Sequence, residues 1–362
     1  MLRYSNFVDA LGFLRDVVRF GVGEAVERHG GPDAILHKPG DSRTVSIEVG
    51  GEYHNSSDNH NWDYVYELEA EFREQAAPVI VREAVRLARD NQSIACDRTG
   101  MHLDLSGGFP DRSIEVPSFM ADRSILPFYF PSMMALAHLL DSMLTYSFLS
   151  PVLRLLRKPT PGRVLEPDGA NLSSVLETSR GFDPWSVERI GQFLRAIVPT
   201  VELIGPVRHG DFEIVRFRTH EESKPVAEFD ASAMSDGTLR ALAALTACYQ
   251  SIPPHGHPTF VAIEEPETAL HPAAMRALVG ALDEATLRTQ VLVTTHSPDL
   301  LDAEEITPTN VRVVQMIDGK TVIGPVDEVG IEIVAEHLNT LAGLEREDRL
   351  RADPDDLARQ TA

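Results

Sequence analysis

The fold is decided by residues 260–267, Phe-Val-Ala-Ile-Glu-Glu-Pro-Glu, and residues 294–299, Thr-Thr-His-Ser-Pro-Asp. The first stretch is an apolar run that ends in paired carboxylates. The second follows another apolar run, Gln290 to Val293, and delivers a histidine. Open α/β sheets bind ligands beyond the carboxyl ends of their strands, and buried ionisable groups cost free energy unless they are paired or used. We therefore expect Glu264, Glu265 and His296 to lie together at one sheet edge and to take part in chemistry there.

The bulk composition describes an acidic, soluble type of chain. It has 362 residues, 43% of them hydrophobic, and a formal net charge of −22. This charge argues against a broad basic face of the kind that binds nucleic acid. Nucleic acid stays a possible partner, but the charge does not indicate it. The densest basic segment holds Arg154, Arg157, Lys158 and Arg163, and a solvated loop explains it equally well.

The cysteine content and the apolar segments indicate a cytoplasmic protein. Cys96 and Cys248 are far apart in sequence, so neither a disulfide framework nor a cysteine metal site is indicated. The start of the chain has no secretory signal pattern. The most apolar segment, residues 133–153, contains His138, Asp141 and Pro151, which favours a buried helix over a membrane span.

Hydrophobic periodicity outlines the elements of the N-terminal half. It predicts a helix over residues 6–18 and antiparallel strands over 45–49 and 62–72. From about Pro78 to Leu156 the pattern turns mostly helical, and a Pro/Gly-rich connection over 158–171 marks a boundary. These features predict an N-terminal part over 1–75, a helical arm over 76–170 and a second lobe over 171–362.

The second lobe alternates between helices and strands. Asp183-Pro184 predicts a helix start, because an N-cap acceptor precedes a proline at the first helical position. Short strands are expected near residues 201–204, 212–217 and 226–229. Helices from 238 and 271 then alternate with strands at 260, 290 and 311, and Asp318-Gly319 predicts a hairpin turn. This alternation is typical of a mostly parallel sheet with flanking helices.

Three segments together resemble the ABC-type P-loop ATPases, and among them the soluble RecF/SMC-like group of AAA family ATPases. They are Met234-Ser235-Asp236-Gly237-Thr238-Leu239-Arg240, the Glu264–Glu267 turn and the Thr294–Asp299 turn. The resemblance implies an α/β P-loop NTPase head of ABC type with a mixed sheet and an inserted helical arm. It also implies ATP and Mg²⁺ as cofactors and a homodimer with nucleotides held between its subunits.

The segment around Ser235, Asp236 and Gly237 resembles the signature loop, which opens a helix. A helix N-terminus favours phosphate through its N–H groups and its dipole. The resemblance implies that this loop contacts the γ-phosphate of ATP held by the opposite subunit. The alternative is an ordinary N-cap before an Ala/Leu-rich core helix.

The other two segments resemble the Walker B strand end and the switch region. The resemblance implies that Glu264 holds Mg²⁺, that Glu265 polarises the attacking water, and that His296 senses the γ-phosphate. Phosphoryl transfer needs a metal to neutralise charge and an acceptor to orient the nucleophile. Many relatives carry aspartate where this chain has Glu264.

Residues 269–272, Ala-Leu-His-Pro, resemble the D-loop that follows Walker B. Glu267 and His271 are four residues apart, which raises the alternative of a zinc site. Pro272 at a helix start places His271 before the helix, so the two side chains do not share a helical face, and no third ligand has matching spacing.

The family's phosphate cradle is a Gly-rich loop that ends in Gly-Lys-Ser/Thr, and we find no such loop at the start of this chain. Ser5 and Asn6 align with the residues after the family's lysine, so Tyr4 stands in the place of that lysine. By this alignment Ser5 would serve Mg²⁺, and Ser5 and Asn6 would contact nucleotide. A truncated ATPase explains this better than a lost site, because Glu265, His296 and the signature loop all persist.

The sequence therefore predicts an ATP-hydrolysing ABC-type ATPase that acts through nucleotide-driven dimerisation. Relatives serve in DNA repair, chromosome maintenance and phage defence, often beside a nuclease, which here would be a separate effector. The alternative is a non-catalytic pseudo-ATPase that acts as an interaction module. A transporter's ATPase subunit fits less well, because the motifs resemble the soluble group more.

Overall fold

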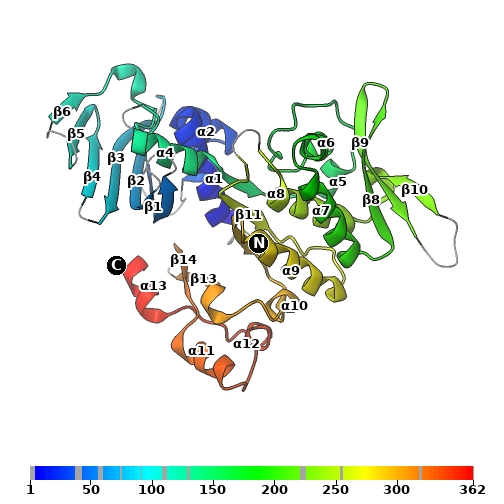
Figure 1. The fold of residues 1–362 in the computed structure, drawn as a ribbon. Coiled ribbons are helices and arrows are strands. Elements are labelled where there is room, and N and C mark those ends of the chain that lie inside the picture. Colours follow the sequence, from blue (N-terminus) through cyan, green and yellow to red (C-terminus); the bar gives the residue numbers. More distant parts are fainter. Residues whose placement is uncertain are drawn as a thin grey trace. The chain divides into compact units, whose positions relative to one another are not determined.

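The computed structural model describes residues 5–36, 43–55, 60–73, 76–90, 92–107, 112–128, 131–220, 226–252, 256–317 and 320–361. The chain divides into two compact units (Figure 1). The sheet unit comprises residues 9–143, and the motif unit comprises residues 1–8 and 144–362. These limits fall elsewhere than at residues 75 and 170, where the sequence suggested divisions.

The sheet unit is built on a six-stranded antiparallel sheet in which each strand pairs with the next along the chain. Its strands are β1 (Thr44–Asn55), β2 (His60–Glu71), β3 (Val79–Arg89), β4 (Gln92–Thr99), β5 (His102–Ser106) and β6 (Arg112–Glu115). Its helices are α2 (Val22–Arg28), α3 (Pro32–Ile35), α4 (Pro131–Asp141) and most of α1 (Ser5–Phe20).

The elements of the sheet unit follow the periodicity of the sequence. Leu11, Leu14 and Val18 of α1 recur at helical spacing and are buried, which confirms the helix predicted over 6–18. In β2 the buried Tyr66 and Leu68 alternate with more exposed residues, which confirms a strand with one face on the core. The strand predicted over 45–49 lies within β1.

The helical arm predicted over 76–170 is wrong for its first part, because residues 79–115 contain β3 to β6. The sequence of β3 mixes Arg and Ala, which favour helices, with Val and Ile, which favour strands. Because β3 pairs with β2 on one side and β4 on the other, tertiary hydrogen bonding decides for the strand. In the described ranges between residues 76 and 170, the α-helices are α4 and α5 (Ser150–Leu153).

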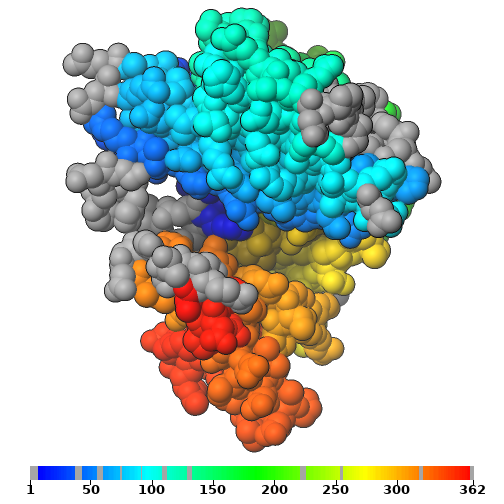
Figure 2. All heavy atoms as spheres, turned by 90° about the vertical axis from the view of Figure 1, so that its left-hand side faces the viewer, coloured from blue at the N-terminus to red at the C-terminus, as the bar shows by residue number. Residues whose placement is uncertain are grey.

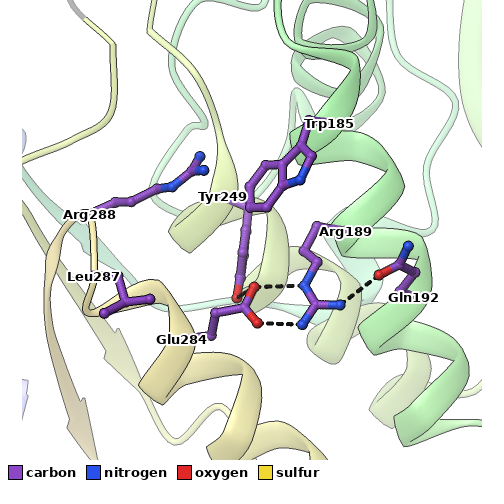
Figure 3. Close-up of a pocket in the computed structure, with 7 residues that line it drawn as sticks. All are labelled: Trp185, Arg189, Gln192, Tyr249, Glu284, Leu287 and Arg288. Carbon is purple, nitrogen blue, oxygen red and sulfur yellow. Dashed lines mark hydrogen bonds and ion pairs between the residues drawn. The ribbon is translucent and has the colours of Figure 1, made fainter.

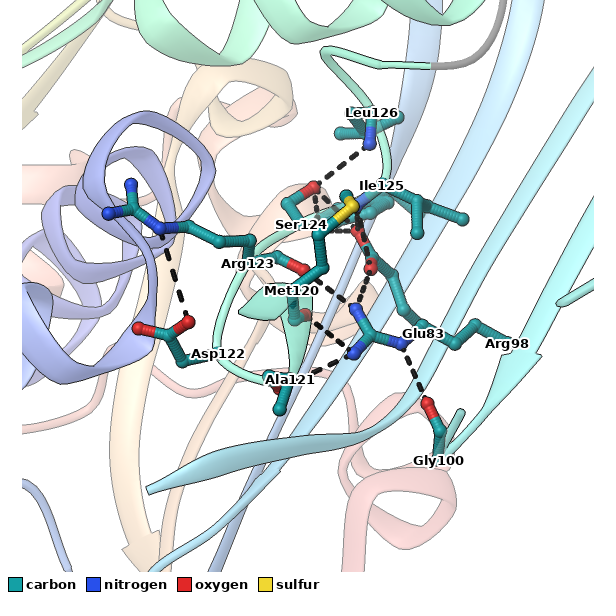
Figure 4. A network of polar contacts seen from close by, with 11 residues as sticks. Glu83, Arg98, Gly100, Met120, Ala121, Asp122, Arg123, Ser124, Ile125 and Leu126 are labelled. Atoms are coloured by element: carbon teal, nitrogen blue, oxygen red, sulfur yellow. Dashed lines mark hydrogen bonds and ion pairs between the residues drawn. The ribbon is translucent and has the colours of Figure 1, made fainter. Parts of the chain in front are cut away.

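A buried ion pair lies on the inner face of this sheet (Figure 4). Glu83 on β3 and Arg98 on β4 are both 0% exposed, with 3.5 Å between Arg98 Nη1 and Glu83 Oε2. Glu83 accepts hydrogen bonds from Tyr66, Ser124 and the Ile125 N–H. Arg98 donates to the carbonyl oxygens of Gly100, Met120, Ala121 and Arg123. The pair thus fastens residues 120–125 to the sheet.

The described residues of the motif unit form three smaller sheets. They are ordered β12-β11-β7, β10-β9-β8 and β13-β14. The strands are β7 (Met143–Tyr146), β8 (Val201–His209), β9 (Phe212–Thr219), β10 (Ala227–Asp230), β11 (Phe260–Glu264), β12 (Gln290–Thr294), β13 (Arg312–Ile317) and β14 (Lys320–Pro325). The helices, besides α5, are α6 (Leu172–Phe182), α7 (Pro184–Ile197), α8 (Asp236–Tyr249), α9 (Met275–Ala285), α10 (Pro298–Leu301), α11 (Glu328–Ala335), α12 (Leu341–Arg346) and α13 (Pro354–Thr361).

The core of the motif unit surrounds α8. This helix is apolar on nearly all sides and packs against α7, α9 and β11, as such a helix must in a globular protein. The predicted start of α7 is confirmed, since the Asp183 carboxylate accepts the Ser186 N–H at its N-cap. β11 and β12 are parallel, as the alternation predicted, whereas β8, β9 and β10 pair antiparallel. The mixed α/β architecture is therefore confirmed.

The C-terminal part of the motif unit has a small core of its own. The β13–β14 hairpin packs with α12 and α13 through Val313, Val322, Leu344 and Leu357. Figure 2 shows α11 to α13 in orange and red beside this hairpin. The predicted turn at Asp318-Gly319 lies outside the described residues. Within the described ranges, no helix has the length and hydrophobicity that crossing a bilayer requires.

Candidate functional site

The predicted acids and histidine lie at the carboxyl ends of two neighbouring parallel strands. Glu264 ends β11 and pairs in register with Thr294, which ends β12. The Glu265 N–H then donates to the Thr294 carbonyl oxygen at 3.0 Å, so the parallel pairing continues one residue beyond the strands. We call residues 264–267 and 294–297 the carboxyl edge. Its two halves are adjacent, as expected from the sequence.

Glu265 is held in an unusual backbone conformation. Its φ is +42°, a left-handed value that is uncommon for a residue other than glycine and costs on the order of 1 kcal/mol. Its N–H is bonded to Thr294, and its carbonyl oxygen accepts from Arg240 Nη2 at 2.9 Å. The half-buried carboxylate accepts from the Thr268 hydroxyl at 3.1 Å. Neighbours therefore fix both the backbone and the side chain at this position.

Glu267 is the most buried acid of the carboxyl edge, with 6% of its surface exposed. Its Oε1 accepts from the Thr295 hydroxyl, which in turn accepts the Ser297 N–H at 2.9 Å. Its Oε2 is buried and has no hydrogen-bond partner among the described residues. Burial raises the pKa of Glu267, and the Thr295 hydrogen bond opposes that shift. Glu267 thus links the turn after β11 to the loop that carries His296.

The raised pKa of Glu267 makes its contribution to stability depend on pH. The folded state holds the proton more tightly than the unfolded state, whose pKa is near 4.5. Stability from this group is therefore complete below pH 4.5 and is lost as the pH rises towards the folded pKa. Glu267→Gln removes this loss, so the free energy of unfolding of the variant should increase relative to that of the parent as the pH rises from 4 to 7.

Urea unfolding at several pH values measures the difference in the free energy of unfolding between the variant and the parent, called the gap below. Glu304→Gln, at an exposed position, is the control and should show a gap that hardly changes with pH. A gap for Glu267→Gln that is equally flat would contradict a raised pKa.

The predicted signature loop begins α8. Ser235 is the N-cap, and its Oγ accepts the Thr238 N–H at 3.2 Å. Asp236 pairs with Arg154, whose Nη1 also donates to the Ser232 carbonyl oxygen, so Arg154 is more than a solvated loop residue. The Ser235 and Asp236 side chains are exposed. The capping role and the predicted signature role are therefore compatible: Ser235 caps the helix and still faces outward.

Gly237 packs directly on the predicted D-loop. A Cβ at this position would stand 2.3 Å from the carbonyl oxygen of Ala269, which itself has a φ of +66°. Only glycine leaves room for that carbonyl. The start of α8 and the turn after β11 therefore touch through their backbones.

Arg240 is the site residue that the sequence reasoning missed. It lies within the signature segment, where its position alone gave it no role, yet it contacts Glu265 through its guanidinium. Burial lowers its pKa, and Glu265, Glu267, Asp236 and Glu264 oppose that shift. The signal in the sequence was a lone arginine in an Ala/Leu-rich helix, where a charge has to find partners.

His296 and His271 of the predicted site differ in their structural positions. His296 follows β12 and is exposed, at the carboxyl edge where the sequence placed it. His271 caps the short helix Pro272–Ala274, with its Nδ1 accepting the Ala273 N–H at 3.1 Å. His271 thus precedes a helical turn, as Pro272 predicted.

Residues 153–302 match the family model described as "AAA domain, putative AbiEii toxin, Type IV TA system". The match contains the signature loop and both halves of the carboxyl edge. This segment is therefore similar to that AAA family, and the match supports the resemblance of the motifs to the ABC-type P-loop ATPases.

Solved structures of SMC heads are similar to the chain at low identity. An SMC head domain with an extended coiled coil bound to the C-terminal domain of ScpA, from Pyrococcus furiosus, shares 11% identity over 92% of this chain and 90% of that chain, with a TM-score of 0.44. An SmcHead bound to the C-winged helix domain of ScpA shares 12% over 88% and 85%, with a TM-score of 0.44. The SMC head domain from Thermotoga maritima shares 12% over 74% and 76%, with a TM-score of 0.34. No curated protein matches the chain.

The N-terminal residues that were aligned with the family's phosphate cradle are described only in part. Ser5 and Asn6 begin α1, whereas their side chains and the whole of Tyr4 lie outside the described residues. The sequence does contain a Gly-Lys-Thr tripeptide at 319–321. Thr321 lies on β14 and pairs antiparallel with Met316, and no helix follows directly within the described residues 320–327. A P-loop leads from a strand into a helix, so this tripeptide does not form a P-loop.

The donor set at the carboxyl edge suits Mg²⁺. The edge offers carboxylate oxygens, including the buried Glu267 Oε2. No group of three or more His, Cys, Asp or Glu residues in the described part of the chain is arranged to hold a metal by itself. Mg²⁺ is commonly bound by one or two carboxylates together with waters and substrate phosphates. The carboxylates present at this edge fit that mode.

A surface pocket of about 360 Å³ lies at the other end of α8 (Figure 3). Tyr249, in its lining, is the last residue of α8, about 20 Å along the helix from Ser235 at 1.5 Å per residue. The Arg189 guanidinium bonds the Glu284 carboxylate, and Arg288 stacks on the Trp185 ring at 4.0 Å. These groups satisfy one another, and the pocket is separate from the carboxyl edge.

Proposed function

We propose that this protein binds MgATP and hydrolyses it at the carboxyl edge of its AAA domain. The observation that carries the proposal is the convergence of Glu264, Glu265 and the loop of His296 at the ends of two parallel strands, with α8 fastened to the same turn. The family match supports ATPase-type activity for residues 153–302.

The residues divide the work as phosphoryl transfer requires. Glu265 orients the attacking water, because its carboxylate stands at the edge and its backbone is fixed on both sides. Glu264, with Ser5, holds Mg²⁺, which when bound neutralises charge on the phosphates. His296 is exposed at the end of β12, and from there it would contact the γ-phosphate of bound ATP.

The remaining contacts come from a second copy of the chain. Ser235, Asp236 and Gly237 stand at the start of a 14-residue helix, whose N–H groups and dipole favour phosphate. We propose that they hold ATP bound to the opposite subunit of a homodimer, while Asn6 contacts the nucleotide of its own subunit. Dimerisation would then depend on nucleotide.

The biological setting that we propose is cytoplasmic DNA repair or phage defence. The matched family's description names an AbiEii toxin of a type IV toxin–antitoxin system. The net charge of −22 does not favour a broad nucleic-acid surface, so the nucleic-acid chemistry would belong to a separate effector such as a nuclease.

Glu265→Gln tests the proposal. The amide keeps the shape of the side chain but cannot act as a base, so turnover should fall about 10²–10⁴-fold while MgATP binding persists. Calorimetry measures binding, phosphate release measures turnover, and light scattering with and without ATP measures the dimer. Glu304→Gln, on the exposed surface of the same unit, is the matched control and should hydrolyse ATP like the parent.

Three results would decide between the alternatives. Binding, together with turnover that Glu265→Gln abolishes, supports the ATPase. Binding without turnover in the parent chain supports a non-catalytic interaction module instead. No binding of MgATP at any concentration up to 1 mM, roughly the upper range of substrate KM values, overturns the proposal.

A further inference from the structure

A single arginine of the signature helix contacts the backbone on which the proposed water-orienting carboxylate stands. Arg240 lies in the second turn of α8 and reaches two segments that are far away in sequence. Its Nη2 donates to the Glu265 carbonyl oxygen at 2.9 Å, and its Nη1 donates to the Phe148 carbonyl oxygen. One rigid guanidinium therefore holds two carbonyl groups at once.

The two carbonyl groups follow neighbouring strands of one sheet. Glu265 comes directly after β11, and Phe148 comes two residues after β7, which is next to β11 in the order β12-β11-β7. On the other side of β11, the Glu265 N–H is bonded to Thr294 at the end of β12. The N–H of Glu265 is thus bonded directly to the end of β12, and its carbonyl oxygen is linked to the segment after β7 through Arg240.

This arrangement explains how Glu265 keeps its left-handed φ of +42°. Such a conformation persists only where the surroundings over-determine it. Without the guanidinium, the Glu265 carbonyl oxygen would lose its hydrogen-bond donor on α8, and the turn could relax towards ordinary φ values. The carboxylate would then leave the position in which the Thr268 hydroxyl holds it.

We propose that Arg240 is a positioning residue that couples the signature helix to the conformation of Glu265. It does not touch the reacting atoms. Any shift of the start of α8 on nucleotide binding reaches Glu265 through this side chain, and also through the Gly237–Ala269 backbone contact. The effect on turnover rests on the proposed ATP hydrolysis, whereas the effect on the conformation of the turn does not.

The chemistry of arginine fits this role better than that of lysine. The guanidinium is planar, stays charged, and presents several N–H donors in a fixed fork that can serve two acceptors. A lysine ammonium is a point charge and would hold one carbonyl well at most. The four carboxylates around Arg240 favour a cation of either kind. Arginine and lysine therefore differ at this position in the forked donor geometry of the guanidinium.

Arg240→Met and Arg240→Lys test the proposal, with Arg276→Met as control. Arg276 is exposed on α9 in the same unit. Amide hydrogen exchange is the first measurement, because it needs no nucleotide. Exchange across residues 265–270 should accelerate about tenfold or more in Arg240→Met, less in Arg240→Lys, and not in Arg276→Met, while the β13–β14 hairpin keeps its rate.

Turnover is the second measurement. If the parent hydrolyses ATP, Arg240→Met should lower kcat about 100-fold with little change in KM, as expected when a catalytic group is misplaced while substrate binding is intact. Arg240→Lys should recover part of that activity. If the parent shows no turnover, the proposed function fails and the exchange experiment still decides the positioning role.

Two exchange results would overturn the proposal. One is unchanged exchange over 265–270 in Arg240→Met. The other is an equal acceleration throughout the motif unit, which would make Arg240 an ordinary packing residue of α8.

Discussion

Arg98→Met is expected to destabilise the sheet unit by about 3–5 kcal/mol, the cost of removing one partner from a buried ion pair. Glu83 would remain 0% exposed without its cation, and the four carbonyl groups bonded by Arg98 would lose that donor. Burial already raises the pKa of Glu83, so the carboxyl would take up a proton more readily once the cation is gone.

The same sheet supplies a matched control. Arg86 on β3 pairs with Asp97 at 2.9 Å, but its side chain is 47% exposed. Exposed pairs of this kind contribute roughly 0–1 kcal/mol, so Arg86→Met should hardly shift the unfolding midpoint. Urea unfolding followed by circular dichroism measures both variants. Similar midpoints for Arg98→Met and Arg86→Met would contradict the importance of the buried pair.

Gly237→Ala is expected to have the second large effect. The new Cβ would stand 2.3 Å from a backbone oxygen, which cannot rotate away as a flexible side chain could. Either α8 or the turn containing Ala269 has to move, at a cost of about 1–3 kcal/mol for forced overpacking. Since that turn carries Glu265, turnover should be lost as well if the protein is an ATPase.

Gly280→Ala is the contrasting substitution. Gly280 lies inside α9, and no atom beyond its chain neighbours and the helix's own backbone stands within 4 Å of the place that an alanine methyl group would take, so alanine should stabilise the helix by roughly 0.5–1 kcal/mol. Thermal unfolding of the two variants should therefore shift in opposite directions. A neutral Gly237→Ala would mean that the start of α8 is not in firm contact with the turn.

The carboxyl edge could be predicted from sequence because its signals are local. Apolar runs of strand length ended in acids at Glu264 and in a histidine segment at 294–297, and parallel pairing then brought the two ends together. The helix start at Ser235 was equally visible, since an N-cap residue needs only the next turn of chain to act.

Other features depend on contacts between segments far apart in sequence. The strand β3 mixes helix-favouring Arg and Ala with strand-favouring Val and Ile, and its pairing with β2 and β4 decides that it is a strand. Arg240 gains its role from carbonyl groups at 148 and 265, which no spacing in the sequence connects. Glu267 looked like part of an acidic turn, whereas its burial depends on how that turn folds under Thr295.

The insertion of the sheet unit into the motif unit sets an order of assembly during translation. Each strand from β1 to β6 pairs with the one made just before it, so the loops to be closed are short and their entropy cost is small. By contrast, β7 joins a sheet whose central strand, β11, is made only after α8 has emerged. The ribosome therefore delivers a self-contained antiparallel sheet first, and the carboxyl edge is completed among the last events of folding.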